Sequence, residues 1–95
     1  MQLTVIVEHK IKEGQLSAFV DSMSELIRLT KEEEGNIAYD LYEAQDGSGD
    51  VVLVELWESQ QALDAHLQTD HFKELYPASD VHKSSPSVVR IYNRV

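Results

Sequence analysis

A carboxylate, an indole and an imidazole stand close together in the middle of the chain, at Glu55, Trp57 and His66. Glu55 and Trp57 are two residues apart, so within a strand their side chains point to the same face of the sheet. His66 falls on the apolar stripe of the segment that follows, which predicts that it faces inward from a helix. A buried base beside an aromatic wall is suited to removing a proton from a planar substrate. We therefore predict a general-base site in which His66 and Glu55 are catalytic and Trp57 forms a wall.

Each of these three residues also has a purely structural explanation. An inward-facing histidine is more often a hydrogen-bonded core residue than a catalyst, and a lone tryptophan is typical of a hydrophobic core. Glu55 fits this explanation least well, because burying an unpaired carboxylate costs several kcal/mol. It must either face solvent or have a partner, and Arg90 and Tyr92 on the last predicted strand are the candidates for that partner.

The elements that would position these residues follow from the spacing of apolar side chains. Runs that alternate or are rich in β-branched residues predict strands over residues 2–12, 36–45, 51–58 and 88–94. Apolar positions three and four apart predict helices over residues 15–34, 60–68 and 70–76, the last ended by Pro77. The order β-α-β-β-α-β predicts a single α+β domain over residues 1–95, with a ferredoxin-like, four-stranded antiparallel sheet and its helices on one face.

The first helix supplies walls for the predicted site and has an acidic end. Phe19 and Met23 lie on its apolar stripe, and we expect both to line the pocket. The acidic run Glu32–Glu34 then leads to Gly35, the expected C-terminal cap. Carboxylates at this end oppose the helix dipole, so we interpret the run as a solvated helix end that adds no stability.

The strands are apolar on both faces, which bears on assembly. In residues 51–58, Val52, Val54 and Leu56 occupy one face, while Leu53 and Trp57 occupy the other. A sheet with helices on one side and water on the other should instead alternate between apolar and polar residues. The second face therefore needs a cover, and we predict a homodimer in which two sheets pack face to face.

The composition excludes several classes of function. The chain has 17 acidic and 8 basic residues and a formal net charge of -9, which disfavours binding to nucleic acid or to anionic membrane surfaces. It has no cysteine, which excludes disulfides, thiolate catalysis and cysteine-ligated metals. Charged residues interrupt the N-terminal apolar run and no stretch approaches membrane-spanning length, so we expect a cytoplasmic protein without a signal peptide.

Motifs for cofactors and metals are weak. His66 and His71 are five residues apart and do not share a helix face as residues four apart would, although a break at Thr69-Asp70 could redirect His71. The Gly-Ser-Gly sequence at 47–49 belongs to a hairpin loop and is too short for a dinucleotide fingerprint. We therefore expect no metal and no flavin or nicotinamide cofactor.

One long run resembles a known family signature. The sequence ELWESQQALDAH at residues 55–66, followed by TDHF at 69–72, resembles the signature of the antibiotic biosynthesis monooxygenase family. The resemblance extends over essentially the whole chain, from LTVIVEHKIKEGQ near the start, through EEEGNIAYDLYE, to VVRIYN near the end. Proteins of this family are dimeric α+β barrels, so the resemblance implies that fold and that assembly.

The resemblance also implies a cofactor-free monooxygenase, an oxidoreductase acting with dioxygen on a small aromatic phenol, quinol or anthrone-like substrate. In such chemistry the protein deprotonates the substrate, the resulting anion reduces dioxygen, and an apolar pocket confines the intermediates. Carried onto this chain, His66 is the proton acceptor or hydroxyl partner, Glu55 orients or polarises it, and Trp57 is a pocket wall. The complete predicted substrate pocket comprises Trp57, His71, Phe72, Phe19, Met23 and Arg90.

Other relatives imply other functions. Heme-degrading proteins of similar outline carry a heme-ligating histidine where this chain has Tyr76, and a tryptophan where it has His66, so heme is disfavoured. Isomerases of phosphorylated autoinducer-2 match Glu55, His66 and His71 but have a different aromatic residue in place of Trp57. Their substrate needs a cationic seat, for which this chain offers few charges. A non-catalytic ligand-binding dimer is the third alternative.

Overall fold

The computed structural model describes residues 1–95 and confirms the predicted α+β, ferredoxin-like fold. The elements are β1 (Leu3–His9), α1 (Leu16–Thr30), β2 (Asn36–Glu43), β3 (Val51–Trp57), α2 (Gln60–Leu67), α3 (Asp70–Ala78), the 3-10 turn η1 (Ser79–His82) and β4 (Val88–Asn93). None of the helices is both long and apolar enough to cross a bilayer.

The four strands form one antiparallel sheet in the order β2-β3-β1-β4. Its register sets Tyr39 opposite Glu55, Glu55 opposite Val5, and Val5 opposite Ile91. Paired residues of neighbouring strands point to the same face. These four side chains therefore form one row across the sheet, and Glu55 lies within that row.

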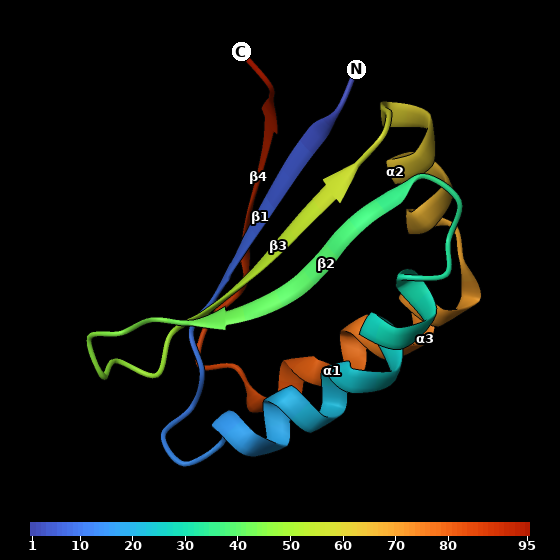
Figure 1. Ribbon diagram of the computed structural model, residues 1–95. Helices are drawn as coiled ribbons and strands as arrows, with labels where there is room; N and C mark the ends of the chain where they lie inside the picture. The colour runs from blue at the N-terminus through green and yellow to red at the C-terminus, as the bar shows by residue number, and fades with distance from the viewer.

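The helices cover one face of the sheet (Figure 1), where α1 and α3 lie side by side. Alternate residues of β1 and β3 point into this layer, as the period of a strand requires. Each large apolar side chain that is fully buried there contributes about 1.5–3 kcal/mol. The core consists of Leu3, Val5, Val7, Phe19, Met23, Leu26, Tyr39, Val51, Leu53, Trp57 and Leu63.

The end of α1 differs from the prediction. The helix stops at Thr30 rather than at residue 34, and the chain then turns tightly. In this turn the Glu33 amide donates to the Thr30 carbonyl, and the Asn36 amide donates to the Glu33 carbonyl. The Glu33 side chain is only 13% exposed. The interpretation of this glutamate as part of a solvated helix end was therefore wrong.

A side-chain cap marks the start of each of the helices α2 and α3. The Ser59 hydroxyl accepts from the Ala62 amide at the start of α2, and the Thr69 hydroxyl accepts from the Phe72 amide at the start of α3. Contrary to the prediction, Pro77 does not end α3, which continues to Ala78. A proline in the last turn forfeits only one backbone hydrogen bond, and the chain continues from there as the tighter turn η1.

Gly35 fixes the approach of the turn after α1 to α2. Its φ is +85°, and a Cβ built on it would lie 2.5 Å from the Cβ of Ala62. Its carbonyl also accepts a hydrogen bond from the Glu58 amide at 2.9 Å. Only glycine satisfies both the backbone conformation and the close contact.

Replacing Gly35 with alanine tests this close approach. We expect Gly35→Ala to lower the free energy of unfolding by about 2–5 kcal/mol, because a left-handed backbone and a steric overlap both become unfavourable. Gly47→Ala is the matched control, since Gly47 has a φ of +78° but no atom within 4 Å of a built Cβ. The control should lose only about 1–2 kcal/mol. Equal losses in urea denaturation would contradict the steric part of the argument.

Candidate active site

A small apolar cavity of about 110 Å³ lies between the sheet and the helices α2 and α3. A cavity of this size holds roughly one aromatic ring. Glu55 and His66 are the only side chains in its lining that ordinarily titrate between acidic and neutral pH. The lining consists of Val5, Val7, Tyr39, Glu55, Leu63, His66, Leu67, Phe72, Tyr76, Val89 and Ile91.

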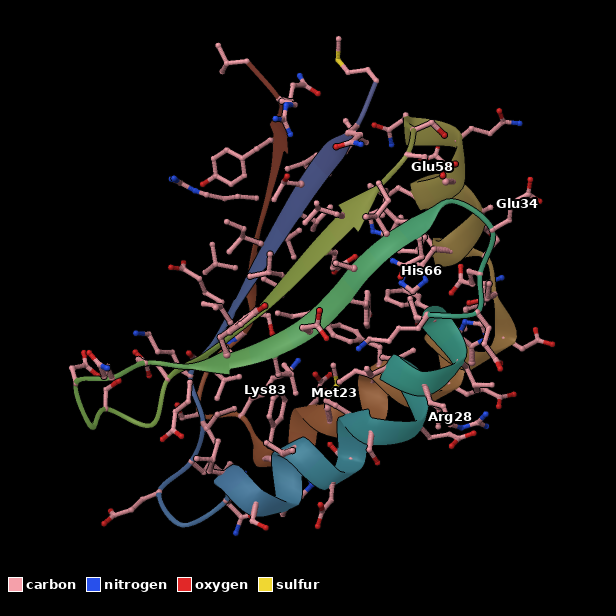
Figure 2. All side chains as sticks on the ribbon, in the orientation of Figure 1. Met23, Arg28, Glu34, Glu58, His66 and Lys83 are labelled. Carbon is pink, nitrogen blue, oxygen red and sulfur yellow. The ribbon has the colours of Figure 1, made fainter.

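His66, which lines this cavity, has one ring nitrogen without a partner. It is 1% exposed and lies between the sheet and the helices (Figure 2). Its Nδ1 is 2.8 Å from Oε2 of Glu33. An ionised carboxylate can only accept, so Nδ1 carries the proton and Nε2 holds the lone pair of the neutral ring. Nε2 is buried and has no hydrogen-bond partner.

The charge state of His66 suits a base. Burial lowers its pKa from the ordinary value, and the hydrogen bond and charge of Glu33 oppose that shift without overcoming it. The ring is therefore mainly neutral near neutral pH, when Nε2 can accept a proton. After accepting one, the ring would be positively charged and would face the negative charge of Glu33 directly.

Glu33 is the residue that sequence reasoning missed. Its Oε2 accepts a second hydrogen bond, from Nε2 of His71 at 2.7 Å, so two imidazoles converge on one oxygen atom. The break capped by Thr69 brings His71 back toward Glu33. The only local signal was the glycine two residues later, which marks a turn after α1 without showing where the side chain points.

Glu55 has a partner within its own strand. The Trp57 indole donates to Oε1 of Glu55 at 2.9 Å, which replaces the predicted partners Arg90 and Tyr92. Glu55 is 5% exposed, and burial raises its pKa to about 7 although the hydrogen bond from Trp57 acts in the opposite direction. Glu55 and His66 both line the cavity, but each is hydrogen-bonded to a different partner.

Aromatic rings surround the imidazole of His66. Its ring centroid lies 4.8 Å from that of Trp57, 4.9 Å from that of Phe72 and 5.4 Å from that of Tyr39. Phe72 lines the cavity, whereas the fully buried Trp57 contacts His66 without lining it. Of the predicted pocket residues, Trp57 and Phe72 therefore lie beside the imidazole.

Four other predicted pocket residues lie elsewhere. Phe19 and Met23 are fully buried in the core but do not line the cavity, and His71 lies beside Glu33. Contrary to the prediction, Arg90 is exposed and does not line the cavity. Val89 and Ile91 line the cavity, so alternation along β4 turns Arg90 to the opposite face.

Comparison with known proteins places the chain in a family. The sequence profile described as antibiotic biosynthesis monooxygenase matches residues 2–78, which is most of the chain. The chain belongs to the antibiotic biosynthesis monooxygenase family. A solved structure described as an antibiotic biosynthesis monooxygenase is 32% identical, with a TM-score of 0.88 over 98% of each chain. A conserved protein from Methanosarcina mazei is 26% identical, with a TM-score of 0.95 over 100% of this chain and 94% of that one.

Curated relatives are similar over shorter stretches. The Bacillus subtilis protein YcnE is 31% identical over 67% of this chain and 67% of its own length. Its name describes it, provisionally, as a monooxygenase. An uncharacterised protein of Synechocystis, sll1783, is 29% identical over 87% of this chain. The match spans only 56% of the Synechocystis protein, so the chain corresponds to about half of that relative.

This family member also presents donors that could hold a divalent cation. Glu33, His66 and His71 each offer one ligand atom, and these atoms lie within 4.8 Å of one another. Two imidazole nitrogens and a carboxylate oxygen form a donor set suited to Zn²⁺ or Fe²⁺. In this structure two hydrogen bonds join the same atoms. A cation on Nδ1 of His66 would leave the proton on Nε2, so cation binding and base function exclude each other.

The raised pKa of Glu55 predicts a stability change with pH. The folded protein keeps this proton up to about pH 7, whereas the unfolded chain loses it near the ordinary value of 4.5. The folded state therefore binds more protons in that window, and the contribution of Glu55 to stability falls as pH rises through it. Glu55→Gln removes the titration and keeps an acceptor for Trp57.

We expect the stability of Glu55→Gln relative to wild type to increase from pH 4.5 to 7, by about 2–3 kcal/mol in all. Urea denaturation of both proteins at pH 5 and pH 8 measures the difference. The pKa of His9, lowered by burial to about 4, makes wild-type stability fall as pH drops below 6.5, but this effect is common to both proteins and cancels. A difference that does not change with pH would contradict the prediction.

Proposed function

We propose that this chain is a cofactor-independent monooxygenase that oxidises a small aromatic quinol or phenol beside His66. The observation that carries the proposal is the buried, unpartnered Nε2 of His66, which Glu33 keeps in its accepting form at the wall of an apolar cavity. Membership of the antibiotic biosynthesis monooxygenase family supports the same reaction class.

The proposed reaction balances without an external reductant. His66 accepts the proton of a substrate hydroxyl, and the electron-rich anion transfers electrons to dioxygen. One oxygen atom forms a new bond to a ring carbon. The hydrogen of that carbon leaves as a proton and the O–O bond breaks, so the other oxygen atom leaves as water. A quinol and dioxygen thus give a hydroxylated quinone and water, and the substrate supplies all the electrons.

The two carboxylates have different roles in this scheme. Glu33 lies behind His66 and stabilises the imidazolium that proton transfer creates, because opposite charges attract strongly where water is excluded. Glu55 has a pKa raised to about 7 by burial, so a large fraction of it is protonated near neutral pH. In that form it can donate a hydrogen bond to a substrate oxygen within the same cavity.

Oxygen consumption with a menadiol-type substrate tests the role of His66. We expect His66→Ala to lower the enzymatic rate about 10²- to 10⁴-fold, since it removes the base from the reacting hydroxyl. His82→Ala is the matched control, because His82 bonds to Gln15 outside the cavity. It should keep the wild-type rate. Equal rates for His66→Ala and wild type above the spontaneous background would end the proposal for His66.

The same assay distinguishes Glu33 as a positioning residue. In Glu33→Gln the negative charge that raises the pKa of His66 is lost, so the acidic limb of the rate profile should move to lower pH while the plateau falls. A purely structural role would lower the plateau without moving the limb. Turnover that proceeds equally well without dioxygen would instead favour an isomerase.

We also infer that the working unit is a homodimer formed through the helix-free face of the sheet. Val52, Val54 and Leu56 point to this face. On the same face Tyr42 is 56% exposed and Val88 is 51% exposed. Exposed apolar side chains gathered on one face of a sheet are typical of an interface between copies of a chain.

A charge placed on this face should separate the subunits. We expect Val54→Lys to sediment as a monomer of 10.8 kDa at micromolar concentration, where wild type sediments as a dimer. Val81→Lys is the control, since Val81 is 66% exposed on η1. It should remain dimeric. A wild type that is already monomeric would contradict the inference.

A further inference from the structure

Lys83 is the one buried cation among the lysines and arginines of this acidic chain. It follows η1 and extends between the sheet and the helices (Figure 2). Its ammonium donates to Oδ1 of Asp80 at 3.0 Å and lies 4.4 Å from the centre of the Tyr76 ring. A buried ammonium has three N–H donors, so these contacts leave it able to donate further.

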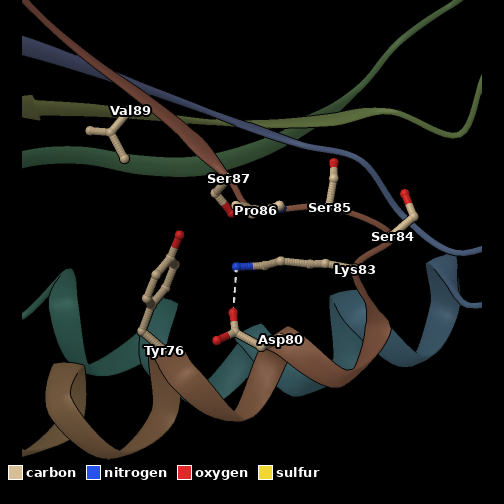
Figure 3. Close-up of a pocket in the computed structure, with 8 residues that line it drawn as sticks. All are labelled: Tyr76, Asp80, Lys83, Ser84, Ser85, Pro86, Ser87 and Val89. Atoms are coloured by element: carbon tan, nitrogen blue, oxygen red, sulfur yellow. Dashed lines mark hydrogen bonds and ion pairs between the residues drawn. The ribbon is translucent and has the colours of Figure 1, made fainter.

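Lys83 forms part of the wall of a second, larger cavity (Figure 3) of about 510 Å³. The other lining residues are Tyr76, Asp80, the loop residues 84–87, and Val89. Tyr76 and Val89 also line the cavity beside His66. The two cavities therefore adjoin at these two side chains, with the inner one apolar and the outer one polar.

In the ion pair between Lys83 and Asp80 at the outer cavity, the ammonium is buried and the carboxylate faces solvent. The Lys83 side chain is 5% exposed, whereas that of Asp80 is 66% exposed. The pKa of His9 reflects this arrangement, because Lys83 lowers that pKa more than Asp80 raises it. His9 also hydrogen-bonds through Nδ1 to the Ser87 hydroxyl at 2.8 Å, so Ser87 is held at the cavity wall. The interior beside this loop is thus electropositive.

The inner cavity is too small for a whole substrate. Pockets for small molecules usually have volumes of about 300–1,000 Å³, whereas the inner cavity measures about 110 Å³. A ring that reaches His66 would leave the rest of the molecule in the outer cavity. A flat aromatic wall joins the two, since Phe72 stacks on Tyr76 at 5.3 Å with only 10° between the ring planes.

We propose that Lys83 binds a carboxylate carried by the aromatic substrate, so that the acid occupies the outer cavity while the hydroxylated ring reaches His66. This inference rests on the function proposed above and names its substrate class as aromatic acids. A single ammonium in a cavity whose loop carries three serines matches a monoanion. A phosphate dianion would call for more positive charge, such as an arginine fork, and the lining has none.

The test uses two probes, one with a carboxylate and one with its neutral methyl ester. These are 1,4-naphthoquinone with a 2-propionate chain, in which ring carbon 3 stays free for hydroxylation, and the methyl ester of the same compound, both in the quinone form that cannot reduce dioxygen. Binding is followed by quenching of Trp57, the only tryptophan of the chain. Wild type should bind the propionate about 10- to 100-fold more tightly than the ester, as expected for a hydrogen bond between charged groups.

Variants assign any preference to Lys83. Lys83→Met should abolish the preference for the acid, whereas Lys73→Met, which removes an exposed lysine of α3, should retain it. Equal binding of acid and ester by wild type would overturn the proposal whatever the folding of Lys83→Met. A preference that persists in that variant would overturn it as well. Tighter binding of a phosphate-bearing analogue would replace the carboxylate assignment.

The two proposals fail in different ways. If the reduced probes are not oxidised but the quinone acid binds through Lys83, the oxygenase function fails and the acid subsite stands. If both reduced probes are oxidised with the same KM and bind equally as quinones, the oxygenase function stands and the acid subsite fails.

Discussion

The geometry of the site depends on a single oxygen atom, Oε2 of Glu33, which accepts hydrogen bonds from His66 and His71. This contact ties the turn after α1 to both α2 and α3. It also fixes which nitrogen of His66 carries a proton, and so leaves the lone pair of the neutral ring on Nε2. The contact in turn requires the tight turn through Gly35, since a helix continued past Thr30 would carry Glu33 along the helix surface. The backbone conformation of the turn at Gly35 therefore determines which nitrogen of His66 carries the proton, although the two residues are far apart in sequence.

The parts of the structure that the sequence predicted are those set by local periodicity. A period of two placed Glu55 and Trp57 on one face of β3, and a helical period turned His66 inward. The contacts of Glu33 were not predicted because they depend on where α1 ends and on how α2 and α3 pack against that end. No local sequence pattern contains this information. Arg90 was misplaced because the residues of β4 do not separate into an apolar and a polar set. Lys83 was missed because loop residues have no period at all.

Burial shifts the pKa values of Glu55 and His66 in opposite directions, and both shifts favour the uncharged side chain. It raises the pKa of Glu55 to about 7 and lowers that of His66, so near neutral pH both side chains can be uncharged. An apolar cavity in this state admits an uncharged phenol without burying a net charge. In the proposed reaction, proton transfer creates an imidazolium and a phenolate together, and Glu33 lies in place to stabilise the imidazolium. Because Glu33 is in place before the substrate binds, it lowers the electrostatic cost of the proton transfer without any rearrangement.

The proposed chemistry and the proposed selectivity depend on different kinds of structure in this molecule. The groups around the inner cavity come mostly from the sheet, α2 and α3, whose packing holds them in place. The outer cavity is built mainly from Asp80, Lys83 and the loop before β4, and loops tolerate sequence change better than the elements that they connect. Changes in that loop can therefore alter which molecules reach His66 without moving the imidazole or its carboxylate. On this argument a common fold and base can serve many aromatic substrates, and the residues that distinguish them lie outside the periodic elements by which the family is recognised.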